Sequence, residues 1–253
     1  MEDKKKIILF SQNDQIFLRK KLPLIVDILS IKYQIKYVFL SNPSPFGKRM
    51  SIFNKIRDTI YIFGISFFIY YSFKMLIGMF VNFFYPLKNQ INNIVFIKEN
   101  INKYFEENKL DEVDLAVSLA GNHIIKEDLL KWPRSGWINL HCAPLPLYRG
   151  LMPSFWALKN DEEEFGATVF LMDEGIDSGP IICQKKFNIQ GLTQQSLIDK
   201  SKDIGIELIS HAVDIQLNGN VNYISNEKEK STYYTFPTRT DVAEFRRKGK
   251  KFF

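Results

Sequence analysis

Cysteine and histidine are scarce in this chain of 253 residues, which has two Cys and three His. Two cysteines are too few for a disulfide framework, and their scarcity is typical of a reducing cytosol. These five side chains, at 123, 141, 142, 183 and 211, do not follow the spacing of a metal site. We therefore expect no disulfide scaffold and no metal.

A glycine-rich phosphate loop is also missing. The first apolar run, Lys6–Ser11, is followed by Gln12-Asn13-Asp14 and not by glycines, which argues against a dinucleotide site. The charged residues Met1 to Lys6 lead directly into this run, so no secretory signal peptide is predicted. No nucleic-acid recognition motif is present. These absences favour a cytoplasmic protein that does not bind nucleic acid.

Aromatic residues and positive charge are abundant instead. The chain has 22 Phe and 11 Tyr, a formal net charge of +6 and a pI near 9.1. Its length suits one medium-sized domain with a substantial core. The positive charge favours anionic partners such as a nucleotide, a folate tail or an anionic membrane surface.

Apolar runs alternate with amphipathic segments along most of the chain. Lys6–Ser11 and Gln34–Leu40 read as strands, and helical spacing runs between them from Gln15 to Ile31, which together make a βαβ unit. We expect a Rossmann-like, doubly wound, mostly parallel sheet. Its further elements are predicted as strands at 93–97, 113–120, 168–172 and 180–189, and helices at 99–108, 124–130, from 153 or 154, and 193–217.

Residues 43–90 interrupt this pattern. The stretch begins with a mixed basic part that contains Lys48 and Arg49, and Ile60 to Leu87 is then nearly all apolar and aromatic, with Lys74 as its one charge. Its length would suit a membrane span, but one crossing would separate two halves of a single sheet. Gly64 and Gly78 suggest two shorter helices. Two interpretations stay open: a helical pair packed on the sheet or in a homodimer, and a peripheral anchor on the cytoplasmic face of a membrane.

The most informative stretch runs from Trp137 to Gly150. It begins as an apolar strand and ends in a Pro/Gly-rich loop that continues neither strand nor helix. Asn139 and His141 are two residues apart, so on a strand both project from one face. Ligands bind at the carboxyl ends of strands in open α/β sheets. A second loop, 173–180, brings a carboxylate in a Gly/Pro setting.

These pieces form an ordered pattern: Asn-x-His, then Leu-Pro-x-Tyr-Arg-Gly at 145–150, then Asp-x-Gly-x-Asp-x-Gly-Pro at 173–180. The pattern resembles the folate-dependent formyltransferase family, and the resemblance covers roughly 4–40 and 92–219. It implies the formyltransferase fold, 10-formyltetrahydrofolate as co-substrate and no metal. One departure is clear. The family's commonest loop reads His-Pro-Ser-Leu-Leu-Pro, whereas 141–146 reads His-Cys-Ala-Pro-Leu-Pro, so the serine hydroxyl is absent.

The resemblance implies that Asn139, His141 and Asp177 are catalytic. An amide donor can stabilise the oxyanion of formyl transfer, and an imidazole can move protons near neutral pH. Whether His141 acts as base or as charged stabiliser stays open, and Cys142 is interpreted as apolar filler. The implied folate-binding residues are Leu119, Gly121, His123, Ile125, Asp173, Gly175 and Ile176, and the expected substrate-binding residues are Tyr148, Arg149 and Gly150. For Arg149 and His123 a structural role is the alternative.

The resemblance also bears on the acceptor. Methionyl-tRNA members carry a second C-terminal domain, for which the roughly thirty residues after Gly219 are too few. The expected class is a nucleotide-sugar N-formyltransferase of surface-polysaccharide synthesis that acts on a nucleotide-linked amino-deoxy sugar. A phosphoribosylglycinamide formyltransferase and a non-catalytic, membrane-associated binding module are the alternatives. We expect a catalytic domain over 1–226, which contains the insertion 43–90, then a basic, aromatic tail over 227–253, and a homo-oligomer, most simply a dimer.

Overall fold

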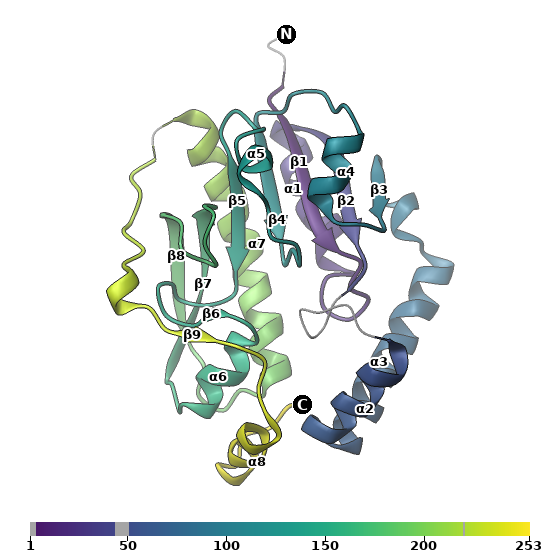
Figure 1. Cartoon of the computed structure of the whole chain (residues 1–253), viewed down its shortest axis with the longest axis vertical. Coiled ribbons are helices and arrows are strands. Elements are labelled where there is room, and N and C mark those ends of the chain that lie inside the picture. Colours follow the sequence, from purple (N-terminus) through teal and green to yellow (C-terminus); the bar gives the residue numbers. More distant parts are fainter. Residues whose placement is uncertain (1–3, 44–50, 220) are drawn as a thin grey trace.

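The structure is a computed structural model that describes residues 4–43, 51–219 and 221–253. Its centre is a seven-stranded sheet in the order β3-β2-β1-β4-β5-β7-β8 (Figure 1). The first five strands of that order are mutually parallel, β7 is antiparallel to β5, and β8 is antiparallel to β7. The predicted mostly parallel sheet is therefore confirmed. The strands are β1 (Lys6–Gln12), β2 (Gln34–Ser41), β3 (Ile94–Ile97), β4 (Leu115–Leu119), β5 (Trp137–His141), β7 (Glu164–Leu171) and β8 (Ile181–Asn188).

Helices cover both faces of this sheet (Figure 1). Along β1, Ile7 and Leu9 pack toward α1 (Lys21–Lys32) and α7 (Gln194–Asn218). Ile8 and Phe10 pack toward α4 (Ile101–Glu107) and α5 (Glu127–Leu130). All four side chains are fully buried. This explains why the run is continuously apolar, because a parallel strand that is covered on both faces has no solvent side.

The ends of α7 follow the sequence signals closely. Thr193 caps the helix by accepting a hydrogen bond from the backbone N–H of Ser196, and the Ser196 side chain returns the bond. Gly219 ends the helix in the left-handed conformation, with φ of 73°, which glycine adopts without a steric penalty. The helix is 25 residues long. It forms one wall of the sheet's core and thereby fixes the position of β5.

An aromatic cluster lies beyond the sheet, around α6 (Pro153–Lys159) and α8 (Arg239–Arg247). Phe155, Phe245 and Phe252 stack in it, and none of the three is more than 5% exposed. The short strands β6 (Arg149–Gly150) and β9 (Tyr233–Tyr234) pair alongside. The segment 227–253, which we expected to be a basic, aromatic tail, thus holds the short strand β9 and a helix, α8, that was not predicted.

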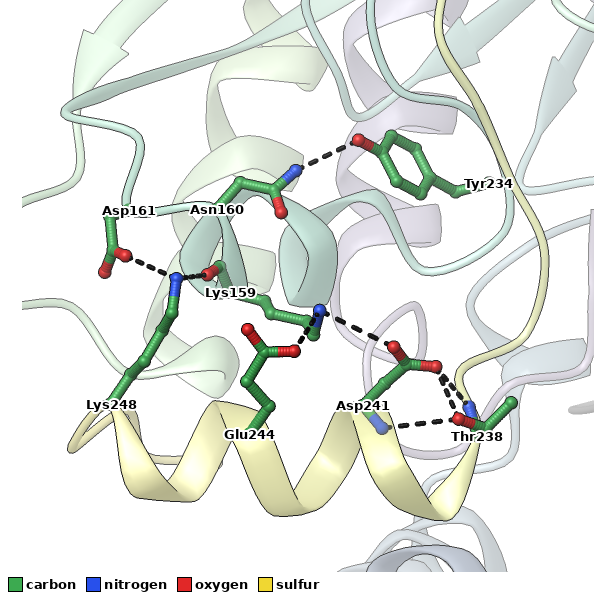
Figure 2. A network of polar contacts seen from close by, with 8 residues as sticks. All are labelled: Lys159, Asn160, Asp161, Tyr234, Thr238, Asp241, Glu244 and Lys248. Carbon is green, nitrogen blue, oxygen red and sulfur yellow. Dashed lines mark hydrogen bonds and ion pairs between the residues drawn. The ribbon is translucent and has the colours of Figure 1, made fainter.

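Polar contacts hold α8 against α6 (Figure 2). The Lys159 ammonium lies 2.7 Å from a Glu244 carboxylate oxygen and 3.5 Å from an Asp241 carboxylate oxygen. Lys248 donates to the Lys159 carbonyl at 2.8 Å. Thr238 caps α8 through a reciprocal bond with Asp241. The helix was missed because its basic composition hides an apolar stripe of only two residues, Val242 and Phe245.

The insertion forms two helices, α2 (Ile52–Phe63) and α3 (Ile65–Phe84), and a 3-10 turn η1 (Leu87–Asn89) follows. The expected pair of helices is confirmed, and its break falls at Gly64, with φ of 85°. Gly78 is not a second break, because it lies inside α3 at close approach to the backbone of Gln15. The basic residues Lys48 and Arg49 lie outside the described residues.

Several boundaries differ from the sequence prediction, and three of them concern how an element begins. α1 begins at Lys21 and not near Gln15, because 15–20 form turns on which α3 packs. α6 has Met152 at its N-cap, in the left-handed conformation, so Ser154 is not the cap. β7 begins at Glu164, four residues before the predicted Thr168.

Gly78 gives a test of how α3 docks. A Cβ at this position would lie 2.4 Å from the backbone oxygen of Gln15. Helix propensity alone predicts that Gly78→Ala stabilises by about 1 kcal/mol, whereas overpacking costs about 1–3 kcal/mol. We expect a net loss in the free energy of unfolding, measured by urea denaturation. Ser66→Ala, on an exposed position of the same helix, is the control and should change little. A more stable Gly78→Ala variant would contradict this docking.

Candidate active site

Asn139 and His141 lie at the carboxyl end of β5, on the face opposite Leu140. Leu140 points toward α7, where its side chain would meet any Cβ placed on Gly205. His141 is 8% exposed, and its Nε2 lies 2.9 Å from the carbonyl oxygen of Tyr148. A carbonyl only accepts, so this contact assigns the proton of the neutral ring to Nε2. Nδ1 is then the atom at which the imidazole gains or loses a proton.

Asp177 faces that nitrogen, since its Oδ2 lies 3.6 Å from His141 Nδ1. The two residues approach from opposite directions. β7 runs antiparallel to β5, and the loop that follows it begins beside Trp137, where the Met172 N–H donates to the Trp137 carbonyl at 2.7 Å. The loop then folds back along β5 and brings Asp177 to His141. The carboxylate thus faces the ring nitrogen at which the imidazole exchanges its proton.

The carboxylate of Asp177 also holds the neighbouring loop. Its Oδ2 accepts the Gly150 N–H at 2.9 Å. Asp177 itself is in the left-handed conformation, with φ of 50°. Gly150 is required where it stands, because its φ is 92° and a Cβ would lie 2.3 Å from the carbonyl oxygen of Tyr234. The aspartate loop, the Gly150 loop and the end of β5 thus form one unit.

Asn226 is a part of this site that the sequence analysis missed. Its amide donates to the backbone carbonyls of Asp177, at 3.0 Å, and Gly179, at 2.8 Å. Its side-chain oxygen accepts from Arg149 Nη2 at 2.7 Å. No local signal marks this residue, because it lies 49 positions from Asp177 in a polar stretch. Asn226 thereby fastens the aspartate loop to the loop that carries Arg149.

The predicted substrate-binding side chains are mostly engaged within the protein. Tyr148 is 4% exposed, and its hydroxyl donates to Glu162 at 2.6 Å. Burial, together with this bond, raises the pKa of the Tyr148 phenol. Arg149 is 7% exposed and binds Asn226. The structural role that was kept as the alternative for Arg149 is therefore the one seen here, and contact of these residues with a substrate remains a prediction.

The predicted folate-binding residues fall into two loops. After β4, Leu119 and Ile125 are buried in the core, so only their backbone can face a ligand. Gly121 packs so tightly on Ser118 and Phe10 that a Cβ would lie 2.7 Å from Ser118 Oγ. His123 accepts the Ile101 N–H at 3.1 Å and so supports the start of α4. The structure does not test whether these residues bind folate.

The second loop lies between β7 and β8. Asp173 accepts hydrogen bonds from the Ser178 hydroxyl, at 2.7 Å, and the Gly175 N–H, at 3.1 Å, so it shapes the turn. Ile176 is 51% exposed and offers apolar surface to a ligand. Because β4 and β5 are adjacent and parallel, the loop after β4 lies beside the end of β5. The folate-binding prediction for these residues stands untested.

The two cysteines are free thiols. Burial raises the pKa of the Cys142 thiol and raises that of Cys183 to about 11. A thiol with a raised pKa holds less of the nucleophilic thiolate. Within 4–43, 51–219 and 221–253, no cluster of three or more His, Cys, Asp or Glu side chains could hold a metal ion. The raised pKa values make both thiols poor nucleophiles.

Comparison with known proteins identifies this arrangement. The family model described as formyl transferase matches residues 90–213, the segment that carries Asn139, His141 and Asp177. The segment 90–213 belongs to the formyl transferase family. The resemblance seen in the sequence is thereby confirmed for the part of the chain that builds the catalytic loops.

Curated relatives of the formyl transferase segment include methionyl-tRNA formyltransferases. That of Thermodesulfovibrio yellowstonii is 38% identical over 107 residues, which are 42% of this chain and 35% of the relative. That of Clostridioides difficile is 31% identical over 147 residues, which are 57% of this chain and 48% of the relative. The chain thus spans less than half the length of these relatives.

Solved structures share the fold over nearly the whole chain. A sugar 3N-formyl transferase, crystallised with dTDP and 5-N-formyl-THF, has a TM-score of 0.58 at 22% identity over 91% of this chain and 69% of its own. An N-formyltransferase from Helicobacter canadensis, in complex with folinic acid and dTDP-3-aminofucose, has a TM-score of 0.58 at 19% identity over 91% and 71%. A phosphoribosylglycinamide formyltransferase from Anaplasma phagocytophilum has a TM-score of 0.60 at 14% identity over 93% and 100%. At these identities the likeness shows the fold.

We predict that Asn226→Ala destabilises the formyl transferase site. The substitution removes the donor to two loop carbonyls and the side-chain acceptor of the Arg149 guanidinium, which keeps its bond to the backbone carbonyl of residue 226. This loss should cost about 1–3 kcal/mol in the free energy of unfolding. Urea denaturation gives the stability. Asn92→Ala, at an exposed position, is the matched control. Equal stability of the two variants would show that Asn226 does not fasten these loops.

Proposed function

We propose that the chain transfers the formyl group of 10-formyltetrahydrofolate to the amine of an acceptor. The observation that carries this proposal is the meeting of Asn139, His141 and Asp177 at the carboxyl end of β5, inside the segment that matches the formyl transferase model. Attack of an amine on the formyl carbon creates a tetrahedral oxyanion and an ammonium that must lose a proton. The site supplies a group for each need.

Asn139 donates its amide N–H to the developing oxyanion. His141 accepts the proton at Nδ1, because its Nε2 is held by the Tyr148 carbonyl. Asp177 stabilises the imidazolium that results. The proton is then returned to the folate nitrogen as the C–N bond to the formyl group breaks. In this scheme His141 is the proton-transfer group and Asn139 stabilises the oxyanion.

The proposed acceptor is a nucleotide-linked amino-deoxy sugar. Two neighbours in fold were crystallised with dTDP or dTDP-3-aminofucose, and each aligns with 91% of this chain. The net charge of +6 favours a diphosphate. Tyr233 supports this choice as well. Its ring is 55% exposed and packs on the backbone of Gly150, next to the Asp177 carboxylate.

Methionyl-tRNA is the second candidate acceptor, because curated relatives that share 31–38% identity with this chain are methionyl-tRNA formyltransferases. Glycinamide ribonucleotide is a third, on the fold likeness to phosphoribosylglycinamide formyltransferases. A direct assay separates them. The protein is incubated with 10-formyltetrahydrofolate and, in turn, nucleotide-linked amino sugars, methionyl-tRNA and glycinamide ribonucleotide. Turnover of a sugar alone would support the proposal, and turnover of either other acceptor alone would overturn it.

The catalytic roles predict different losses of turnover. His141→Ala should lower kcat about 10²–10⁴-fold, and Asn139→Ala about 10²–10³-fold. Asp177→Asn keeps the shape of the side chain and removes its charge, so kcat should fall while the free energy of unfolding changes little. Glu174→Ala, at an exposed position of the same loop, is the control and should keep most of its activity. Full activity of His141→Ala would contradict the mechanism.

Tyr233 predicts a change in acceptor binding. Stacking of a base or sugar on an exposed ring contributes enough that Tyr233→Ala should raise KM for the nucleotide sugar about tenfold. KM for the folate should be unchanged. The control is Phe96→Ala, which removes an equally exposed ring, at 54%, on the distant edge strand β3 and should leave the acceptor KM unchanged. An unchanged acceptor KM in Tyr233→Ala would show that this ring does not touch the substrate.

A further inference from the structure

One face of α3 consists of large apolar side chains that no part of the described chain covers. Six of them form an outward stripe along the helix, with exposures between 57% and 79%. At steps of three and four residues they share one side of the helix. This outward stripe is made of Ile65, Ile69, Phe73, Leu76, Phe80 and Phe83.

The polarity of α3 is reversed relative to a helix that packs on a soluble domain. Its packed side includes Tyr71, which touches Phe17, and Gly78, which lies on Gln15. The half-buried polar residues Lys74 and Asn82 lie on that same side. The helix thus turns polar groups toward the protein and apolar groups outward. Only an apolar environment outside the chain makes this arrangement favourable.

The topology decides how α3 can meet such an environment. Ile65–Asn89 is long and apolar enough to span a membrane. An 18-residue stretch of it has a mean hydropathy of 1.5, and 6% of that stretch is buried inside the protein. However, α3 connects β2 to β3, which are neighbours in one sheet. Both ends of the helix therefore stay with the domain, so α3 can lie along a bilayer surface but cannot cross it. At 1.5 Å per residue the outward stripe extends about 30 Å.

The charges around this face have one predominant sign. Between 51 and 98, Asp58 is the one acidic residue, and the basic residues are Lys55, Arg57, Lys74, Lys88 and Lys98. At the N-terminal end of α3, α8 adds Arg239, whose guanidinium lies over the Tyr61 ring of α2. A second copy of this chain would bring an equally basic surface against the first. An anionic lipid surface is complementary to it.

A pocket of about 470 Å³ lies at the other end of α3 and is lined by Arg19, Lys20, Phe84 and Tyr85 among others. Arg19 is 6% exposed, donates to the Tyr85 carbonyl, and its Nε is buried without a partner. Among the described residues Arg19 makes no ion pair. Phe84 and Tyr85 are 57% and 70% exposed and continue the apolar surface into this pocket. A buried cation beside an apolar ridge suits the phosphate of a lipid whose chains lie along α3.

We propose that α3 lies flat on an anionic phospholipid leaflet, with its outward stripe in the acyl region and the Arg19–Lys20 pocket on a lipid phosphate. Lys88 and the basic residues of α8 contact neighbouring headgroups. Aromatic rings are well suited to this depth, and eight of the twenty residues of α3 are Phe or Tyr. The protein then works at the membrane surface while its sheet stays in water.

Flotation with vesicles tests this arrangement on the full chain. The probe is a vesicle of phosphatidylcholine, with or without a third of phosphatidylglycerol. The wild-type protein should float with the anionic vesicles and bind neutral ones at least about fivefold less. Phe80→Glu should lower binding to anionic vesicles about tenfold or more, because a ring that inserts into the acyl region of the bilayer is replaced by a charge. Lys20→Glu should weaken binding to anionic vesicles and leave binding to neutral vesicles unchanged.

Matched variants exclude general effects of charge. Ile31→Glu changes a residue of α1 that is 74% exposed, and Lys109→Glu reverses an exposed charge away from α3. Both should bind vesicles like the wild type. Equal binding of neutral and anionic vesicles, or of Phe80→Glu and Ile31→Glu, would overturn the proposal. So would a wild-type dimer, seen by analytical ultracentrifugation, that ignores vesicles and dissociates in Phe80→Glu, because α3 would then be a subunit interface.

Discussion

The carboxylate of Asp177 is the point at which three separate segments of the site meet. It faces His141 Nδ1 at 3.6 Å and accepts the Gly150 N–H at 2.9 Å. Without it, the loop after β7 loses its hydrogen bond to Gly150, and the imidazole loses the carboxylate that faces its Nδ1. Because Nε2 is held by the Tyr148 carbonyl, one nitrogen positions the ring and the other exchanges protons. The same contact thus fixes both the geometry and the chemistry.

That contact depends in turn on the segment 221–253. Asn226 donates to the backbone carbonyls of Asp177 and Gly179, and β9 pairs with β6, which contains Gly150. The aromatic cluster around Phe155, Phe245 and Phe252 and the ion pairs of Figure 2 keep this segment in place. A stretch that looks like a basic tail therefore supports the site. The cost of ordering it is offset by the burial of large rings.

The insertion differs from the rest of the chain in which side chains it exposes. Its helix α3 turns the half-buried side chains of Lys74 and Asn82 toward the protein and exposes apolar ones, yet it lies where an ordinary crossover helix would connect β2 and β3. In a soluble domain that surface would favour aggregation. The fold can retain it because the docking side is secured by the close approach of Gly78 to Gln15. The outward side is then free to serve binding to something outside the chain, which we infer to be lipid.

The sequence alone determined the mostly parallel sheet, because β1 and β4 contain the continuous apolar runs Ile7–Phe10 and Leu115–Val117, which are typical of strands covered on both faces. It also determined that Asn139 and His141 share a face, since that follows from the two-residue period of a strand. The two ends of α7, at Thr193 and Gly219, could be predicted from the sequence because helix capping involves only residues close in the chain.

Only the tertiary structure decided what lies far apart in the chain. The approach of Asp177 depends on an antiparallel strand whose loop folds back, and the role of Asn226 depends on three segments at once. Helix α8 and the outward direction of α3 were hidden for the same reason. Which side of an apolar helix is covered depends on the shape of its neighbours, and that shape exists only once the chain has folded.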